Sequence, residues 1–212
     1  MARILLTAGP TRAPLDDVRF LTNASSGRMA LSLVRAATAA GHEVTVVSGP
    51  VAVEYPRGVR VLRVTTTAEM LAACLERLPH VDGVIAAAAP CDFEPVRRVR
   101  GKIPRRGTGL VLRLRPTVDV IATVARRARA GQWMVAFALE PDADPRRALE
   151  KVTTKRCDLI VVNGLAAVDA ATTALTVYDR GHARVGGTSG TKAAAARWLI
   201  RLIERRLMQA QP

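Results

Sequence analysis

Short apolar runs alternate with segments of helical periodicity almost from the first residue, and this alternation limits the fold more than any other feature. We predict buried strands at residues 3–7, 43–48, 59–65, 83–88, 134–139 and 159–163. We predict helices at about 25–41, 68–78, 119–130 and 145–154. Strands that alternate with helices favour βαβ units. The expected fold is therefore a doubly wound, mostly parallel, Rossmann-like α/β sheet, with a hairpin near 179–181 and a helix at 191–208, in one domain over residues 1–212.

The composition is that of a chain with one substantial aliphatic core. It is 49% hydrophobic and only 3% aromatic. No apolar stretch reaches the roughly 18 residues that a membrane helix needs. Cys74, Cys91 and Cys157 show no CxxC or Cys/His spacing, so we predict no metal site and no disulfide. We expect a cytoplasmic protein with no membrane partner.

The charge balance indicates anionic ligands without identifying them. Lysine and arginine number 32 against 18 acidic residues, a net charge of +14. Such a surface attracts nucleic acid, acidic lipid or phosphorylated metabolites, although a general preference for arginine explains the excess equally well. Residues 96–115 carry eight basic residues and no acidic one, with glycines and a proline between them. We predict a mobile basic loop there, ending in a strand at 110–114.

The first connection between a strand and a helix is unusually long, running from residue 8 to residue 24. Two to six residues are usual in such a position. It lacks the GxGxxG pattern of dinucleotide-binding turns. It ends instead in Asn23, Ser25, Ser26 and Gly27 at the start of a helix, where free N–H groups suit a phosphate or an oxyanion. The alternative is an ordinary serine N-cap with Asn23 in a turn.

This segment resembles the opening of the phosphopantothenoylcysteine synthetases, whose pattern is TAGPTxEPLDPVRxxxNxSSGxMG. The matching positions are Thr7-Ala8-Gly9-Pro10-Thr11-Arg12, Pro14-Leu15-Asp16, Val18-Arg19-Phe20, Asn23, Ser25-Ser26-Gly27 and Met29. Later segments agree in the same order, at Val46 to Pro50, Ala86 to Asp92, Lys102-Ile103, Asp119, Phe137-Ala138 with Glu140, Lys151, Lys155, Asp158 and Asn163. The resemblance covers essentially the whole chain.

The resemblance implies a ligase of coenzyme A biosynthesis that joins 4′-phosphopantothenate to L-cysteine. The reaction uses CTP with Mg²⁺ and passes through an acyl-cytidylate; ATP use stays open. It also implies a homodimer that completes a substrate site across two subunits. No residues precede the synthetase start, so we expect the flavin-dependent decarboxylase on another polypeptide and no flavin here.

The family's site residues are carried over position by position. Asn23 is the expected catalytic residue and, with Arg19, a substrate contact. The expected nucleotide contacts are Gly9, Ser25, Ser26, Gly27, Ala86, Ala87, Ala88, Asp92, Lys102, Val118, Asp119, Val120, Ile121, Phe137, Lys151 and Lys155. Taken singly, each lysine would be an ordinary solvated side chain, and Phe137 a core residue.

Five departures from the family pattern bear on activity and on the choice of nucleotide. Arg28 replaces a lysine, Ala30 a glycine, Pro90-Cys91 the usual Val-Ala, Thr117 an asparagine and Gly164 an aspartate.

Two other functions remain open. An NAD(P)-dependent reductase would need a Tyr-x-x-x-Lys base, but neither tyrosine has a lysine four positions later. A nucleic-acid-binding module would use the basic loop, although aromatic stacking residues are scarce.

Overall fold

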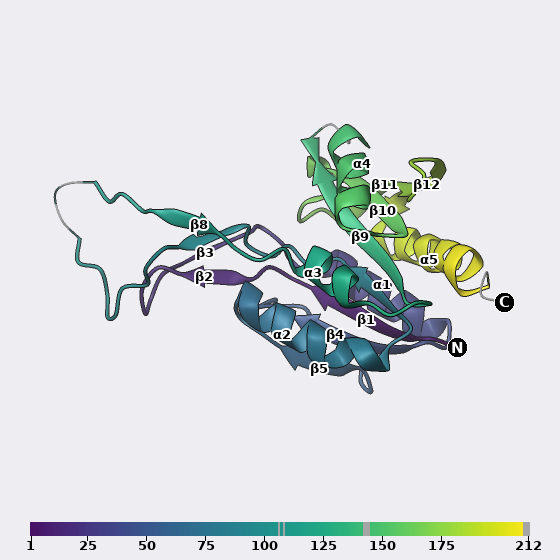
Figure 1. Cartoon of the computed structure of the whole chain (residues 1–212), viewed down its shortest axis with the longest axis horizontal. Helices are drawn as coiled ribbons and strands as arrows, with labels where there is room; N and C mark the ends of the chain where they lie inside the picture. Colours follow the sequence, from purple (N-terminus) through teal and green to yellow (C-terminus); the bar gives the residue numbers. More distant parts are fainter. Residues whose placement is uncertain (106, 108, 142–144, 210–212) are drawn as a thin grey trace.

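The computed structural model describes residues 1–105, 107, 109–141 and 145–209. Its centre is an eight-stranded sheet in the order β12-β11-β10-β9-β6-β1-β4-β5 (Figure 1). The six parallel strands are β1 (Arg3–Ala8), β4 (Glu43–Ser48), β5 (Arg60–Arg63), β6 (Gly83–Ala86), β9 (Trp133–Glu140) and β10 (Leu159–Gly164). The predicted hairpin is confirmed as the antiparallel pair β11 (Thr172–Asp179) and β12 (Arg184–Thr191).

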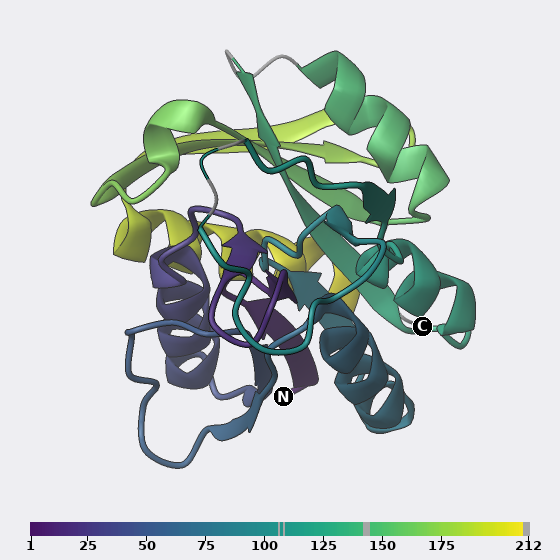
Figure 2. The same ribbon diagram turned by 90° about the vertical axis from the view of Figure 1, so that its left-hand side faces the viewer.

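Helices cover both faces of the sheet, which confirms the doubly wound prediction (Figure 2). One core cluster joins the sheet to α1 (Arg28–Ala39) and α5 (Lys192–Ile203), and α5 continues into a π-helical turn, Glu204–Met208. The other core cluster joins it to α2 (Thr67–Arg77), α3 (Val120–Arg127) and α4 (Pro145–Thr154). The described residues also include two single-turn 3₁₀ helices, η1 (Leu78–His80) and η3 (Leu165–Ala167). Within those residues, no helix is long and apolar enough to cross a membrane.

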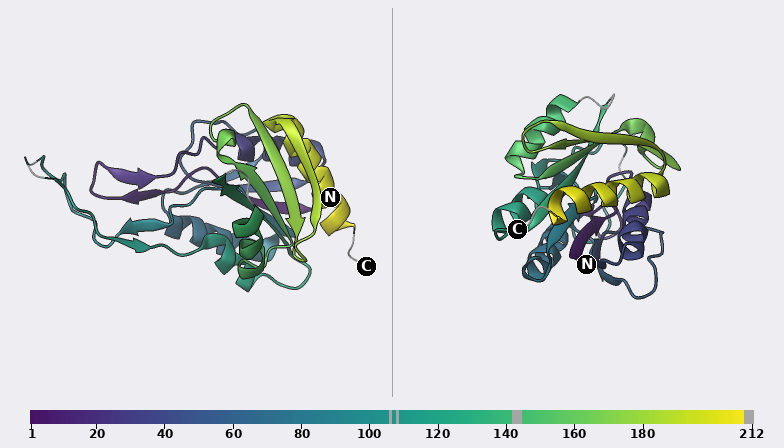
Figure 3. Two further views of the ribbon diagram at one scale, coloured as in Figure 1. Left: turned by 90° about the horizontal axis from the view of Figure 1, so that it is seen from above. Right: turned by 90° about the vertical axis from the view of Figure 1, so that its right-hand side faces the viewer.

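An arm made of two short antiparallel ribbons projects from the carboxyl edge of the sheet (Figures 1 and 3). One ribbon pairs β2 (Arg12–Pro14) with β3 (Phe20–Thr22), inside the long first connection. The other pairs β7 (Phe93–Pro95) with β8 (Leu114–Pro116) and carries the predicted basic loop, of which residues 106 and 108 lie outside the described part. The sequence analysis missed three of these four strands.

The predicted strand at 110–114 is wrong for all but its last residue, because β8 spans Leu114–Pro116. Leu110, Leu112 and Leu114 alternate with other residues as in a half-buried strand. All three are exposed, and β7 offers only three residues as a pairing partner. The alternation of apolar residues therefore predicted a strand at a place where no core packs against the chain.

The basic loop is docked on the first ribbon through residues 98–103. The buried Asp16 accepts hydrogen bonds from the Ile103 amide at 3.0 Å and from the Arg19 guanidinium. Asp17 accepts from the Gly101 amide at 2.7 Å and pairs with Arg98 at 2.8 Å. These amide and guanidinium donors hold the pKa of both carboxyls below the ordinary value. The part of the predicted mobile loop next to the ribbon is thus tied down.

Candidate functional site

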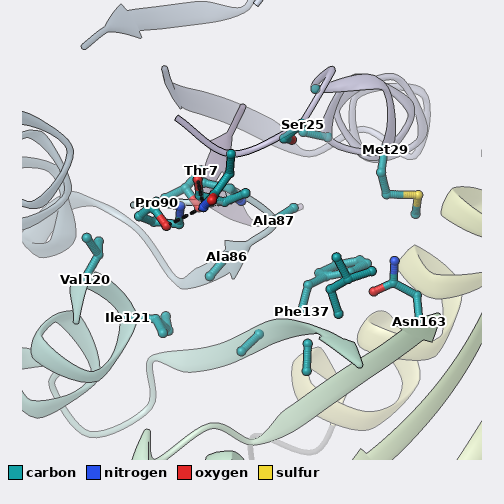
Figure 4. A pocket seen from close by; sticks show the side chains of 18 of the residues that line it. Thr7, Ser25, Met29, Ala86, Ala87, Pro90, Val120, Ile121, Phe137 and Asn163 are labelled. Atoms are coloured by element: carbon teal, nitrogen blue, oxygen red, sulfur yellow. Dashed lines mark hydrogen bonds between the residues drawn. The ribbon is translucent and has the colours of Figure 1, made fainter. Parts of the chain in front are cut away.

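A cavity of about 740 Å³ lies at the point where the strand order reverses. From β1, the chain places β4 and β5 on one side and β6, β9 and β10 on the other. The crevice outside the carboxyl ends of strands at such a switch point is where open α/β sheets bind ligands. The cavity walls come from the ends of these strands, the 23–27 loop, the first residues of α1, residues 86–92 and the start of α3 (Figure 4). Its volume lies within the usual range for a small-molecule site.

The 23–27 loop enters the helix through a glycine, not a serine. Helix α1 begins at Arg28, and its N-cap is Gly27 with φ of 73° and no side-chain cap. The prediction that the helix begins at Ser25 or Ser26 is therefore wrong by two to three residues. Gly27 is required because its φ is left-handed and a Cβ there would lie 2.8 Å from Val51 Cγ1. Among the residues that the structure describes, no side chain caps α1, so its first N–H groups are open to a ligand beside the two serines.

Asn23 ties this loop to the end of β6. Its amide nitrogen donates to the Ala89 carbonyl at 3.1 Å and to the Pro90 carbonyl at 2.8 Å. Both amide hydrogens are therefore used in this conformation, while the side-chain oxygen accepts no hydrogen bond from any described residue. Asn23 lines the cavity, as predicted, but to donate to a bound oxyanion it must first release one of the two carbonyls.

The turn at residues 90–92 is braced by threonine hydroxyls. Thr11 Oγ1 accepts from the Cys91 amide at 2.8 Å, and Thr117 Oγ1 donates to the Cys91 carbonyl at 2.6 Å. The Thr117 amide donates to the Asp92 carbonyl at 2.9 Å. Asp92 is consequently held at the cavity wall with its side chain exposed.

Two of the three predicted lysines line the cavity from α4 and the turn after it. Lys155 Nζ lies 3.1 Å from Asp119 Oδ2, while Asp119 Oδ1 caps α3 by accepting from the Ala122 amide at 3.0 Å. Lys151 pairs with the buried carboxylate of Glu140, at the end of β9. Each ammonium is thus placed by a carboxylate and keeps further N–H donors for a phosphate.

Most of the other predicted contacts also gather here. Ser25, Ser26, Gly27, Ala86, Ala87, Ala88, Val118, Val120, Ile121 and Phe137 all line the cavity. Gly9, Arg19 and Lys102 do not. Gly9, whose φ is 71°, acts through its backbone, because its carbonyl accepts from the Ala89 amide at 2.9 Å. Arg19 is held on the arm by Asp16 and the Ile103 carbonyl, and Lys102 is exposed in the neighbouring loop.

The far end of the cavity contains charged residues that the sequence analysis did not assign to the site. Arg28 Nη1 donates to the Asp169 carbonyl at 3.1 Å and lies 3.6 Å from its carboxylate. Lys192, at the start of α5, is only 8% exposed, and burial together with Arg28 lowers its pKa. Met29 and Asn163 lie at the same end (Figure 4). The departure at position 28 was a signal for Arg28, but no sequence signal separates Lys192 from a surface lysine.

A doubly wound sheet with cations and a helix N-terminus at its switch point defines a class of α/β domain that is suited to bind an anion there. The comparisons with known proteins narrow this class. Residues 1–207 match the family model described as the DNA/pantothenate metabolism flavoprotein C-terminal domain. The chain belongs to this family.

Individual relatives agree with the family match. The chain is 35% identical over 187 residues to the coenzyme A biosynthesis bifunctional protein CoaBC of Bacillus subtilis, covering 85% of this chain and 46% of that protein. It is 38% identical over 206 residues to a cysteine/cysteine sulfinic acid decarboxylase from an unknown prokaryotic organism, covering 95% and 57%. The chain thus spans about half the length of these relatives. A crystal structure of the C-terminal domain of CoaBC matches with a TM-score of 0.80 at 31% identity, over 98% of this chain and 96% of that domain.

Proposed function

We propose that this domain is a ligase that joins 4′-phosphopantothenate to L-cysteine at the expense of CTP. The observation that carries the proposal is the cavity at the switch point. In a chain of this family, it brings together Asn23, the 25–27 loop at the α1 N-terminus, and Lys151 and Lys155. These groups supply what the two half-reactions require, an anion cradle and a neutral hydrogen-bond donor.

In the first half-reaction, a carboxylate oxygen of phosphopantothenate attacks the α-phosphorus of CTP and pyrophosphate leaves. Two anions must approach each other, so charge neutralisation is the main demand on the protein. The two lysines and the N–H groups of α1 meet this demand without a covalent intermediate on the enzyme. The product is a mixed anhydride, the acyl-cytidylate.

In the second half-reaction, the amino group of cysteine attacks the acyl carbon. The tetrahedral oxyanion collapses, CMP leaves with the bonding electrons, and the amine proton passes to solvent. Asn23 serves by donating one amide hydrogen to the oxyanion in exchange for the Ala89 or the Pro90 carbonyl. Because the two carbonyls hold the side chain beside the cavity, little reorganisation is needed.

We expect the triphosphate, more than the protein, to supply the ligands that would hold Mg²⁺ at this site. Across the described residues, no group of three or more His, Cys, Asp and Glu side chains could hold a metal ion. Mg²⁺ on nucleotides commonly takes only one or two carboxylates. The exposed carboxylates on the cavity wall are Asp92, Asp119 and Asp169; Asp119 and Asp169 pair with Lys155 and Arg28, so Asp92 would hold the ion. The ion would neutralise phosphate charge. Neither half-reaction transfers electrons, so we propose no role for a flavin.

We further propose that the domain acts as a homodimer formed through the arm. Nine of the 14 exposed large hydrophobic residues in the described parts of the chain lie on the ribbons and their loops, including Val111 at 89% exposure. An exposed apolar patch of this kind favours association. The substrate role proposed for Arg19 then depends on the dimer, because Arg19 does not line the cavity of its own chain. Sedimentation velocity tests this: Val111→Asp should shift a dimer to monomer, and a monomeric parent protein would refute it.

The ligase proposal is tested by pyrophosphate release from purified protein with 4′-phosphopantothenate, Mg²⁺ and either CTP or ATP. Without cysteine we expect at most one equivalent of pyrophosphate per site, and with cysteine continuous release together with CMP. Lys151→Met should raise the apparent KM for CTP roughly tenfold, from one lost charge-assisted contact. Arg147→Met, on the exposed side of the same helix, is the matched control. No release with either nucleotide refutes the proposal.

A further inference from the structure

The chain uses lysine very sparingly, and nearly always at the cavity. Only four of the 32 basic residues are lysines: Lys102, Lys151, Lys155 and Lys192. Three of these four line the cavity. Lys102 is exposed in the basic loop, whereas the other three share one cavity, where a compact ammonium with three donors suits a ligand. Of the three lysines that line the cavity, Lys192 is the one to which the proposed function gives no role.

The surroundings of Lys192 are unusual for a structural lysine. Its side chain is buried, and Nζ donates to the Ala167 carbonyl at 3.0 Å. An ammonium group has three donors, and in the described parts of the chain no carboxylate pairs with this one and no second acceptor bonds to it. The exposed carboxylate of Asp169 offsets part of the Lys192 charge but is shared with Arg28, and a buried cation with so little compensation is unfavourable. The remaining donors therefore call for an anion that enters through the cavity.

A second cation and a helix N-terminus meet Lys192 at the same end of the cavity. Arg28 is the first residue of α1, and its side chain is 54% exposed, so it can turn towards a ligand. Its present partner, Asp169, is more exposed still, at 71%, and the separation of 3.6 Å is long for an ion pair. Gly27 provides no side-chain cap, so the first N–H groups of α1 point to the same region. Met29, the next residue of the helix, marks this end in Figure 4.

We propose that Lys192 and Arg28 form a phosphate subsite that binds the pyrophosphate end of the nucleoside triphosphate, the part that leaves in the first half-reaction. The proposal rests on the proposed function. Two cations and a helix N-terminus match the high charge of the β- and γ-phosphates better than they match the single phosphate of phosphopantothenate. Lys151 and Lys155, which line the cavity from α4 and the turn after it, are left to neutralise the α-phosphate.

The test compares binding of four ligands by isothermal titration calorimetry at fixed ionic strength: inorganic pyrophosphate, CTP, CMP and 4′-phosphopantothenate. Lys192→Met should weaken pyrophosphate and CTP roughly 10- to 100-fold, the size expected for one charged hydrogen-bonding group. CMP and 4′-phosphopantothenate should change less than twofold. Arg197→Met, at an exposed position of the same helix, is the matched control and should leave all four affinities unchanged.

Three results would overturn the subsite: unchanged pyrophosphate affinity, equal losses for CMP and CTP, or a selective loss for 4′-phosphopantothenate. Should Lys192→Met lose its native circular dichroism, Arg28→Met decides by the same comparison, because its side chain is exposed. The subsite and the ligase proposal fail separately. A protein that releases no pyrophosphate from CTP refutes the ligase, whereas the pyrophosphate titrations still decide the subsite.

Discussion

Replacing Asn23 with aspartate tests the central step of the proposed mechanism. The change keeps the size of the side chain but removes both donor hydrogens, which reach the Ala89 and Pro90 carbonyls at 3.1 and 2.8 Å. The first half-reaction does not use these donors, so acyl-cytidylate should still form. The second half-reaction should slow, because no amide is available for the oxyanion.

The size of the effect follows from the exchange that the structure requires. One oxyanion donor contributes about 2.7–4 kcal/mol to the transition state. Releasing a carbonyl to make that bond costs about 1 kcal/mol. The net loss in Asn23→Asp is then about 2–3 kcal/mol, or roughly 30- to 150-fold in the rate of the second step. A donor that was free in the resting protein would give a larger loss.

Rapid-quench measurement with radiolabelled CTP separates the two steps. The variant should accumulate acyl-cytidylate in the presence of cysteine, whereas the parent protein should not. Gln132→Glu is a matched control, because Gln132 also donates to two carbonyls, those of Leu78 and Val81 at 2.7 Å each, but lies outside the cavity. A second-step rate for Asn23→Asp within threefold of the parent would refute the oxyanion role.

Three further predictions concern the fold around the site. Burial raises the pKa of Cys74 and Cys157 to about 12, so at pH 8 roughly one thiol in 10⁴ is ionised. Ellman's reagent should therefore leave both thiols unmodified in the native protein. Rapid labelling of either one, read by mass spectrometry, would contradict this. A guanidinium and three backbone amides hold the pKa of Asp16 below its usual value of about 3.9, so its contribution to stability is full above that pH and is lost as the pH falls below it. Hydrogen exchange of those amides, corrected for intrinsic rates, should stay slow from pH 6 to pH 4 and accelerate as the pH falls from 4 to 2; unchanged protection over the lower interval would count against the carboxylate. Gly27→Ala should lower the free energy of unfolding by about 1–2 kcal/mol from its left-handed φ alone, and should raise the apparent KM for CTP. Adding Val51→Ala should restore only part of the lost stability, as followed by thermal melts.

The fold was predictable from sequence wherever burial of one face imposes a regular spacing of apolar residues. Helix α4 spans the residues 145–154 that were predicted, because its apolar face and its initial proline both mark it. The ribbons of the arm were mostly missed, because three-residue strands outside the core carry no such period. The start of α1 was misplaced because a left-handed glycine that packs on Val51, 24 residues away in sequence, decides it.

The site was predictable only along the motifs of the first helix and the central strands. Asn23 and Asp92 lie in the connections that follow β1 and β6, and the order of these strands fixes which edge of the sheet they reach, whereas Lys155 follows the end of α4. Lys192 instead reaches the cavity because β12 runs antiparallel to β11 and is followed by α5, which packs on the face of the sheet that α1 also covers. That placement depends on antiparallel register at the far edge, which no local pattern around a single lysine encodes.

The two long connections at the switch point give the arm a mechanical link to the cavity. Each leaves the sheet as a ribbon and returns to the cavity wall, one at Asn23 and the other at Thr117. Between them lies Cys91, whose amide bonds Thr11 on the first ribbon and whose carbonyl bonds Thr117 after the second. The same turn carries the Pro90 carbonyl that holds Asn23, so hydrogen bonds connect both ribbons to this side chain. If the arm pairs with a second copy, as we propose, that pairing would reach the Asn23 amide, the proposed oxyanion donor, through these hydrogen bonds.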